Sequence, residues 1–178
     1  TIKPLKLSKE EKNKFYHGFS NEIIWPLFHD FQLLCNFDPT YWTAYLNVNK
    51  KFADAIAEST RPGDFVWVHD YNLMNVASEL RKKLPTVKVG FFLHIPFPPS
   101  DLFVKLPWRK EIIRGLLEFD IIGFQTARDR RNFLQCVKSL ISDFPTSQEK
   151  NVVKFIYNQR PITVGTFPIG IDYLSFES

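Results

Sequence analysis

Polar side chains follow two short apolar segments at the points where each segment ends. His69 and Asp70 come directly after Phe65–Val68, and His94 comes directly after Val87–Leu93. If these segments are parallel strands, their carboxyl ends form the edge at which ligands bind in open α/β sheets. A carboxylate and an imidazole held there can orient a polar substrate through hydrogen bonds or move a proton. Asp70 and His94 are therefore predicted catalytic and substrate-binding residues.

Each of these residues also has a structural interpretation. Asp is a preferred N-cap residue, so Asp70 can simply begin the helix that follows it. His69 is interpreted as a structural hydrogen-bonding partner. A metal bound by His69, Asp70 and His94 is chemically conceivable, because imidazole and carboxylate suit transition metals. However, no HxH or HExxH spacing supports a metal site, and we expect none.

Two aromatic residues near the start of the sequence, Tyr16 and Trp25, are predicted to bind substrate. Aromatic walls with a few polar groups are typical of small-molecule pockets. Trp25 follows Tyr16 by nine positions, which at about 100° per residue places them on opposite faces of a straight α-helix. They can share a pocket only if the helix breaks, and Gly18–Asn21 is predicted to break it. The alternative is that both are ordinary core aromatics.

The elements that must position these residues follow from the pattern of apolar residues. A capping box at Ser8 and Glu11 begins one helix, and Asp38 with Pro39 begins another. Beyond these, we expect strands at Phe65–Val68, Val87–Leu93 and Asp120–Phe124, helices at Leu73–Leu84, Trp108–Leu117 and Arg128–Ile141, a polar loop at Ser142–Lys150, and a hairpin-like pair at Val152–Tyr157 and Ile162–Phe167. This alternation predicts an α/β fold with a doubly wound, mostly parallel Rossmann-like sheet.

Length and composition restrict the class of protein. The 178 residues fit one domain with a sizeable core. A net charge of +4 is too small for a typical polycationic nucleic-acid binder, so we expect no nucleic-acid partner. No apolar run is long enough to span a membrane, and we expect no membrane association. The two isolated cysteines, Cys35 and Cys136, indicate a reducing compartment and hence a cytoplasmic location.

Several motifs then occur in the order found in one known family. They are YHGFSN at 16–21, WPLFH at 25–29, VWVHDY at 66–71, GFFLHIPFP at 90–98, LPWR at 106–109, DIIGFQT at 120–126, RRNFLQC at 130–136 and FPIGID at 167–172. Together these blocks resemble the trehalose-6-phosphate synthases, which belong to glycosyltransferase family 20. The resemblance covers roughly residues 15–140 and 160–172. Blocks in a conserved order are far more specific than any single motif.

The resemblance implies the acceptor-side, N-terminal half of a GT-B glycosyltransferase. Such an enzyme transfers glucose, with retention, from UDP-glucose to glucose 6-phosphate, and it needs neither a metal nor a further cofactor. By the same resemblance Tyr16 contacts the acceptor phosphate region, Trp25 lines the acceptor pocket, Asp70 binds acceptor hydroxyls and His94 touches the donor sugar. A retaining transfer without an enzyme nucleophile depends on positioning and charge stabilisation. Residues 1–178 are accordingly expected to form one partial Rossmann-like domain, inactive without a nucleotide-binding C-terminal domain.

One departure leaves the acceptor open. Asn72 stands where the synthases usually have the second His of HDYH. This keeps two alternatives: a glucosylglycerol-phosphate synthase, or a catalytically inactive synthase-like regulatory subunit. A homo-oligomer is compatible with each interpretation.

Overall fold

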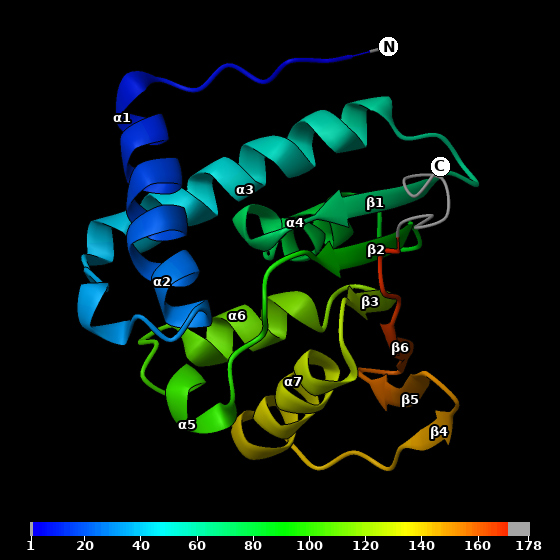
Figure 1. Ribbon diagram of the computed structural model, residues 1–178. Coiled ribbons are helices and arrows are strands. Elements are labelled where there is room, and N and C mark those ends of the chain that lie inside the picture. The colour runs from blue at the N-terminus through cyan, green and yellow to red at the C-terminus, as the bar shows by residue number, and fades with distance from the viewer. Residues whose placement is uncertain (1, 171–178) are drawn as a thin grey trace, which may run out of the picture.

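The structure, a computed structural model that describes residues 2–170, contains one six-stranded sheet (Figure 1). The strand order is β1-β2-β3-β6-β5-β4, in which β1, β2, β3 and β6 are parallel neighbours and β5 and β4 join antiparallel. The strands are β1 (Phe65–His69), β2 (Lys88–Leu93), β3 (Ile121–Phe124), β4 (Ser147–Glu149), β5 (Val152–Tyr157) and β6 (Arg160–Thr166). The end of the FPIGID motif, Ile171 and Asp172, lies outside the described residues.

The helices alternate with the strands after residue 64. They are α1 (Lys9–Lys12), η1 (Asn13–Ile24), α2 (Trp25–Phe28), η2 (Gln32–Leu34), α3 (Pro39–Ser59), η3 (Tyr71–Leu73), α4 (Val76–Lys83), α5 (Ser100–Phe103), α6 (Arg109–Leu116) and α7 (Ala127–Leu140). The predicted α/β class with a mostly parallel sheet is confirmed. The predicted helix over Leu73–Leu84 is shorter, because the chain first makes the separate turn η3. The short elements α5 and β4 were not predicted.

Helices α4, α6 and α7 connect successive parallel strands and share a core with them. Val68, Phe91 and Ile122 point into this core from β1, β2 and β3, together with apolar side chains of all three helices. The opposite face of the sheet exposes Phe65 (54%) and Trp67 (63%) within the described residues. Successive side chains of β1 therefore point alternately to the buried face and to the exposed face of the sheet.

The N-terminal helices confirm one local prediction and correct another. The capping box is present, with the Glu11 amide donating to Ser8 Oγ (3.1 Å) and the Ser8 amide donating to the Glu11 carboxylate (2.8 Å). The predicted break over Gly18–Asn21 is wrong, because η1 is a continuous π-helix that runs into α2. Gly18 serves close packing instead: a Cβ there would lie 2.7 Å from the ring of Tyr41.

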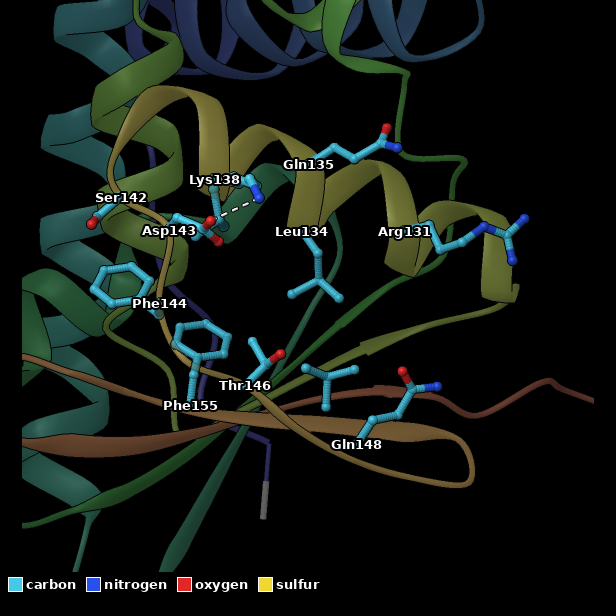
Figure 2. Close-up of a pocket in the computed structure, with 12 residues that line it drawn as sticks. Arg131, Leu134, Gln135, Lys138, Ser142, Asp143, Phe144, Thr146, Gln148 and Phe155 are labelled. Carbon is cyan, nitrogen blue, oxygen red and sulfur yellow. Dashed lines mark ion pairs between the residues drawn. The ribbon is translucent and has the colours of Figure 1, made fainter.

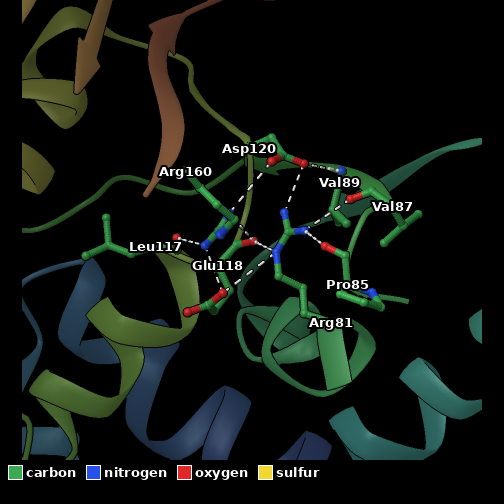
Figure 3. A network of polar contacts seen from close by, with 8 residues as sticks. All are labelled: Arg81, Pro85, Val87, Val89, Leu117, Glu118, Asp120 and Arg160. Carbon is green, nitrogen blue, oxygen red and sulfur yellow. Dashed lines mark hydrogen bonds and ion pairs between the residues drawn. The ribbon is translucent and has the colours of Figure 1, made fainter. Parts of the chain in front are cut away.

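A partly buried ionic network joins the amino ends of the parallel strands (Figure 3). Asp120, just before β3, accepts a hydrogen bond from the amide of Val89 in β2 (2.8 Å) and pairs with Arg81 of α4 (3.0 Å). Arg160, the first residue of β6, pairs with Glu118 (2.8 Å). These contacts hold β2, β3 and β6 in register at one end of the sheet. The register in turn aligns their carboxyl ends at the other.

Candidate functional site

Asp70 and His94 come into contact at the carboxyl edge of the sheet. The amide of Asp70 donates to the carbonyl of Phe92 (2.8 Å), which continues the β1–β2 ladder by one residue. The amide of His94 then donates to Asp70 Oδ1 (3.3 Å). The structure thus brings the two predicted catalytic residues together.

The backbone of Asp70 has an unusual conformation. Its φ is 70° and its ψ is 168°, a region that non-glycine residues rarely adopt. Such a conformation costs of the order of 1–3 kcal/mol and persists only where surrounding contacts enforce it. The side chain makes no capping hydrogen bond to η3, so Asp70 does not act as the helix cap that its position after the strand suggested. Its carboxylate turns to His94 instead.

Tyr45 of α3 provides one part of this enforcement. The Tyr45 hydroxyl donates to the carbonyl of Tyr71 (2.9 Å) and accepts from the amide of Met74 (3.0 Å). The Tyr45 side chain is fully buried, and this burial raises the pKa of its hydroxyl far above the ordinary value. One neutral hydroxyl therefore holds both ends of the turn that follows Asp70.

Asn49, one helical turn later in α3, holds the same segment. Its side-chain amide donates to the carbonyl of Asn72 (3.0 Å) and accepts from the amide of Asn75 (3.1 Å). The sequence analysis missed both Tyr45 and Asn49. A signal for them was available: Tyr45 and Asn49 are four positions apart, so they lie on the same, apolar face of α3, and both carry hydrogen-bonding groups. Buried polar groups of this kind need partners, and here the partners belong to the functional turn.

Tyr16 lies on the π-helix η1 and Trp25 begins α2 directly after it, and the two side chains are 44% and 40% exposed. The interpretation of both as core aromatics is therefore wrong. A π-helix has about 4.4 residues per turn, or about 82° per residue, so nine positions amount to about two full turns. This winding, rather than a break, brings positions 16 and 25 to the same side of the helix axis. The Trp25 ring stacks on that of His29 at 4.2 Å.

A hydrogen bond links this aromatic face to the strand end. The hydroxyl of Tyr71, next to Asp70, donates to Asn21 Oδ1 of η1 (3.2 Å). Burial raises the pKa of Tyr71, and the negative charge of nearby Asp70 raises it further. Tyr71 thus stays a neutral donor at ordinary pH. Asp70 and His94 form one contact pair. Tyr16 and Trp25 belong to the neighbouring elements η1 and α2, and η1 is joined to the strand end through Asn21.

His69 and Gln125 also lie at the carboxyl edge, with different partners. His69 Nδ1 is 2.9 Å from His94 Nε2. Gln125 Oε1 accepts from the amide of Ile169 (3.0 Å), which joins the end of β3 to the segment after β6. Within residues 2–170, no group of three or more His, Cys, Asp or Glu side chains has an arrangement that could hold a metal ion.

Two hollows lie near these elements. Phe65, Trp67 and Phe92 line an apolar hollow of about 700 Å³ on the exposed sheet face, and His69 and His94 belong to its lining. Figure 2 shows a second cavity, of about 310 Å³, between α7 and residues 142–155, where Lys138 pairs with Asp143 (2.7 Å). None of the predicted site residues lines the second cavity.

The comparison with known proteins decides the family. Residues 1–178 match the profile described as glycosyltransferase family 20. The chain belongs to glycosyltransferase family 20. This confirms the resemblance inferred from the ordered motifs.

Similar proteins within family 20 carry informative names. An alpha,alpha-trehalose-phosphate synthase (UDP-forming) of Pichia angusta is 46% identical, with 97% of this chain and 36% of the relative covered. The solved structure of such a synthase from Burkholderia xenovorans in complex with glucose-6-phosphate has a TM-score of 0.85 at 32% identity, covering 93% of this chain and 37% of that one. A structure described as trehalose-6-phosphate from E. coli bound with UDP-2-fluoro glucose has a TM-score of 0.83 at 35% identity, covering 93% and 36%.

The chain therefore spans roughly a third of the length of these family 20 proteins. In the part of the chain that the structure describes, no helix is both long and apolar enough to cross a membrane.

Proposed function

We propose that this chain supplies the acceptor-side, Rossmann-like half of a retaining GT-B glycosyltransferase. The reaction transfers glucose from UDP-glucose to glucose 6-phosphate and forms trehalose 6-phosphate and UDP. The observation that carries the proposal is the contact between Asp70 and His94 at the carboxyl edge of a family 20 sheet. The names of the similar proteins support the choice of substrates.

The roles of the site residues follow from their chemistry. The Asp70 carboxylate accepts hydrogen bonds from acceptor hydroxyls, and its backbone strain fixes the direction in which it points. His94 hydrogen-bonds to the transferred glucose. Tyr16 and Trp25 offer exposed aromatic surfaces with a polar tip, a combination suited to a phosphorylated sugar. These groups position two substrates, which is the main catalytic requirement of a transfer without an enzyme nucleophile.

The first test is UDP release by the full protein from UDP-glucose, with glucose 6-phosphate and glycerol 3-phosphate compared as acceptors. We expect release with glucose 6-phosphate and a loss of about 10²–10³-fold in kcat for Asp70→Asn. Asp143→Asn, the same chemical change in the surface pair with Lys138, is the matched control and should retain activity. Trp25→Ala should raise KM for glucose 6-phosphate about tenfold through loss of aromatic contact area.

The other outcomes select the alternatives. Release with glycerol 3-phosphate alone would assign a glucosylglycerol-phosphate synthase and make Asn72 the specificity candidate. No release with either acceptor would favour a regulatory subunit. We further propose that the reaction needs no metal or cofactor and takes place in the cytoplasm. Activity retained after treatment with EDTA, and cell fractionation, test these two points.

A further inference from the structure

His94 is tied to the end of β1 at two points. Its backbone amide donates to Asp70 Oδ1 (3.3 Å), and its ring Nε2 lies 2.9 Å from His69 Nδ1. The two imidazole rings are near-parallel, with centroids 5.2 Å apart and an interplanar angle of 24°. Consecutive residues of one strand end therefore hold both the backbone and the ring of the same histidine.

Aromatic neighbours restrict the rotation of both rings. The His69 ring lies 4.4 Å from that of Trp67, and the His94 ring lies 4.9 Å from that of Phe92. A free imidazole exchanges between two tautomers and two ring orientations. A short contact between two ring nitrogens requires one of them to donate and the other to accept. His69 thus removes one of the two nitrogens of His94 from competition for other partners.

We propose that His69 is a positioning residue for the glucosyl transfer: by engaging Nε2 of His94, it leaves Nδ1 as the nitrogen that meets the sugar substrate and ties the tautomer of His94 to that of His69. The inference rests on the proposed function, in which His94 contacts the transferred glucose. His69 itself acts through His94 and touches no substrate. The same logic applies to metal-binding histidines, whose orientation and tautomer are set by the partner of the second nitrogen.

The test combines nitrogen NMR with kinetics on the full protein labelled with 15N-histidine. In the wild type, the two ring-nitrogen signals of His94 should report a single tautomer. In His69→Phe, which keeps a ring but removes the nitrogens, they should move toward the averaged positions of a free imidazole. His17 and His29 serve as internal references, and their signals should not move. Within residues 2–170, the ring of His17 packs on Tyr16 and that of His29 on Trp25, and neither ring contacts His69.

The kinetic arm separates positioning from a structural role. His69→Phe should lower kcat about tenfold while KM for glucose 6-phosphate changes less than about twofold, because only the orientation of His94 is lost. His69→Asn, whose amide carries a donor and an acceptor near the position of Nδ1, should restore most of kcat and the single-tautomer signals. Rescue of this kind is not expected if His69 merely fills space.

Three results would overturn the inference. They are His94 signals that do not move in His69→Phe, signals that move without a change in kcat, and a fall in kcat that Asn does not rescue. If the wild-type protein transfers no glucose to either phosphorylated acceptor, the proposed function fails. In that event the NMR arm still decides whether His69 controls the tautomer of His94.

Discussion

The Tyr45 hydroxyl offers the sharpest test of how the fold holds Asp70 in place. Replacing Tyr45 with Phe removes a single oxygen atom and keeps the buried ring that packs on Phe19 at 4.3 Å. The change leaves two backbone groups without their partner: the carbonyl of Tyr71 and the amide of Met74. It therefore perturbs the turn after Asp70 without opening a large cavity.

The magnitude follows from these two groups. A buried polar group left without a hydrogen bond costs about 1–3 kcal/mol. Because the Tyr71 carbonyl lies at a partly buried site, its cost belongs near the lower end of that range. The free energy of unfolding should thus fall by about 3 kcal/mol. At a urea slope of about 3 kcal/mol/M, the midpoint should fall by about 1 M.

Urea denaturation of the protein, followed by Trp fluorescence, measures this shift. The matched control is Tyr41→Phe, because the Tyr41 hydroxyl donates a single long hydrogen bond of 3.3 Å to Glu22 at a partly buried site. Its effect should remain below about 1 kcal/mol. In the UDP-release assay, Tyr45→Phe should also lower kcat several-fold more than Tyr41→Phe, because Asp70 loses part of the frame that enforces its backbone.

Equal midpoints for the two variants would refute the reasoning, since the fully buried hydroxyl of Tyr45 would then contribute no more to stability than that of Tyr41. A large loss of stability with an unchanged kcat would refute its second half. In that case the turn would be stabilised by Tyr45 but Asp70 would be held by other contacts.

Three further predictions concern packing, charge and pH. Gly18→Ala should destabilise the fold by about 1–3 kcal/mol, because the new Cβ would lie 2.7 Å from the Tyr41 ring, and thermal unfolding measures this. Asp120→Asn should cost about 1–3 kcal/mol in urea denaturation, because Arg81 loses its 3.0 Å charged partner and keeps Glu118 at 3.7 Å together with backbone carbonyls. Burial raises the pKa of Cys136 to about 12. The unfolded thiol titrates near about 8.5, so stability linked to this group is complete below that pH and declines by about 1.4 kcal/mol per unit above it. Denaturation at pH 8 and pH 10 should therefore show a loss in the wild type that is about 2 kcal/mol larger than in Cys136→Ala.

Each of these has a clear opposing result. An Ala at position 18 that leaves the melting temperature unchanged would mean that the π-helix tolerates a side chain there. An Asn at position 120 without effect would assign the register of the sheet to apolar packing alone. Parallel pH profiles for the wild type and Cys136→Ala would show that the thiol titrates alike in the folded and unfolded states.

Several local features were predictable because their causes lie within a few residues. The capping box at Ser8 needs only a Glu three positions later. The Asp38 cap likewise needs only a nearby partner, because its carboxylate accepts a hydrogen bond from the amide of Thr40 (2.7 Å). The strands β1, β2 and β3 follow from short apolar runs. Their parallel order then places Asp70 and His94 at one edge of the sheet.

The winding of η1 was not predictable in the same way. Gly18 reads locally as a helix breaker, and an α-helical repeat separates Tyr16 from Trp25. In the structure Gly18 instead lets η1 pack closely against Tyr41 of α3, which is 23 positions further along the chain. A steric contact between segments distant in the sequence leaves no local pattern.

The amino-acid sequence by itself determined the α/β class, the family and the residue types at the strand ends, because these depend on short-range periodicity and ordered motifs. Only the tertiary structure decided that Asp70 adopts a φ of 70°, that Tyr45 and Asn49 hold its turn, and that His69 meets His94. Burial and hydrogen bonding between segments more than 20 residues apart enforce those details. Such contacts exist only once the sheet and α3 have packed together.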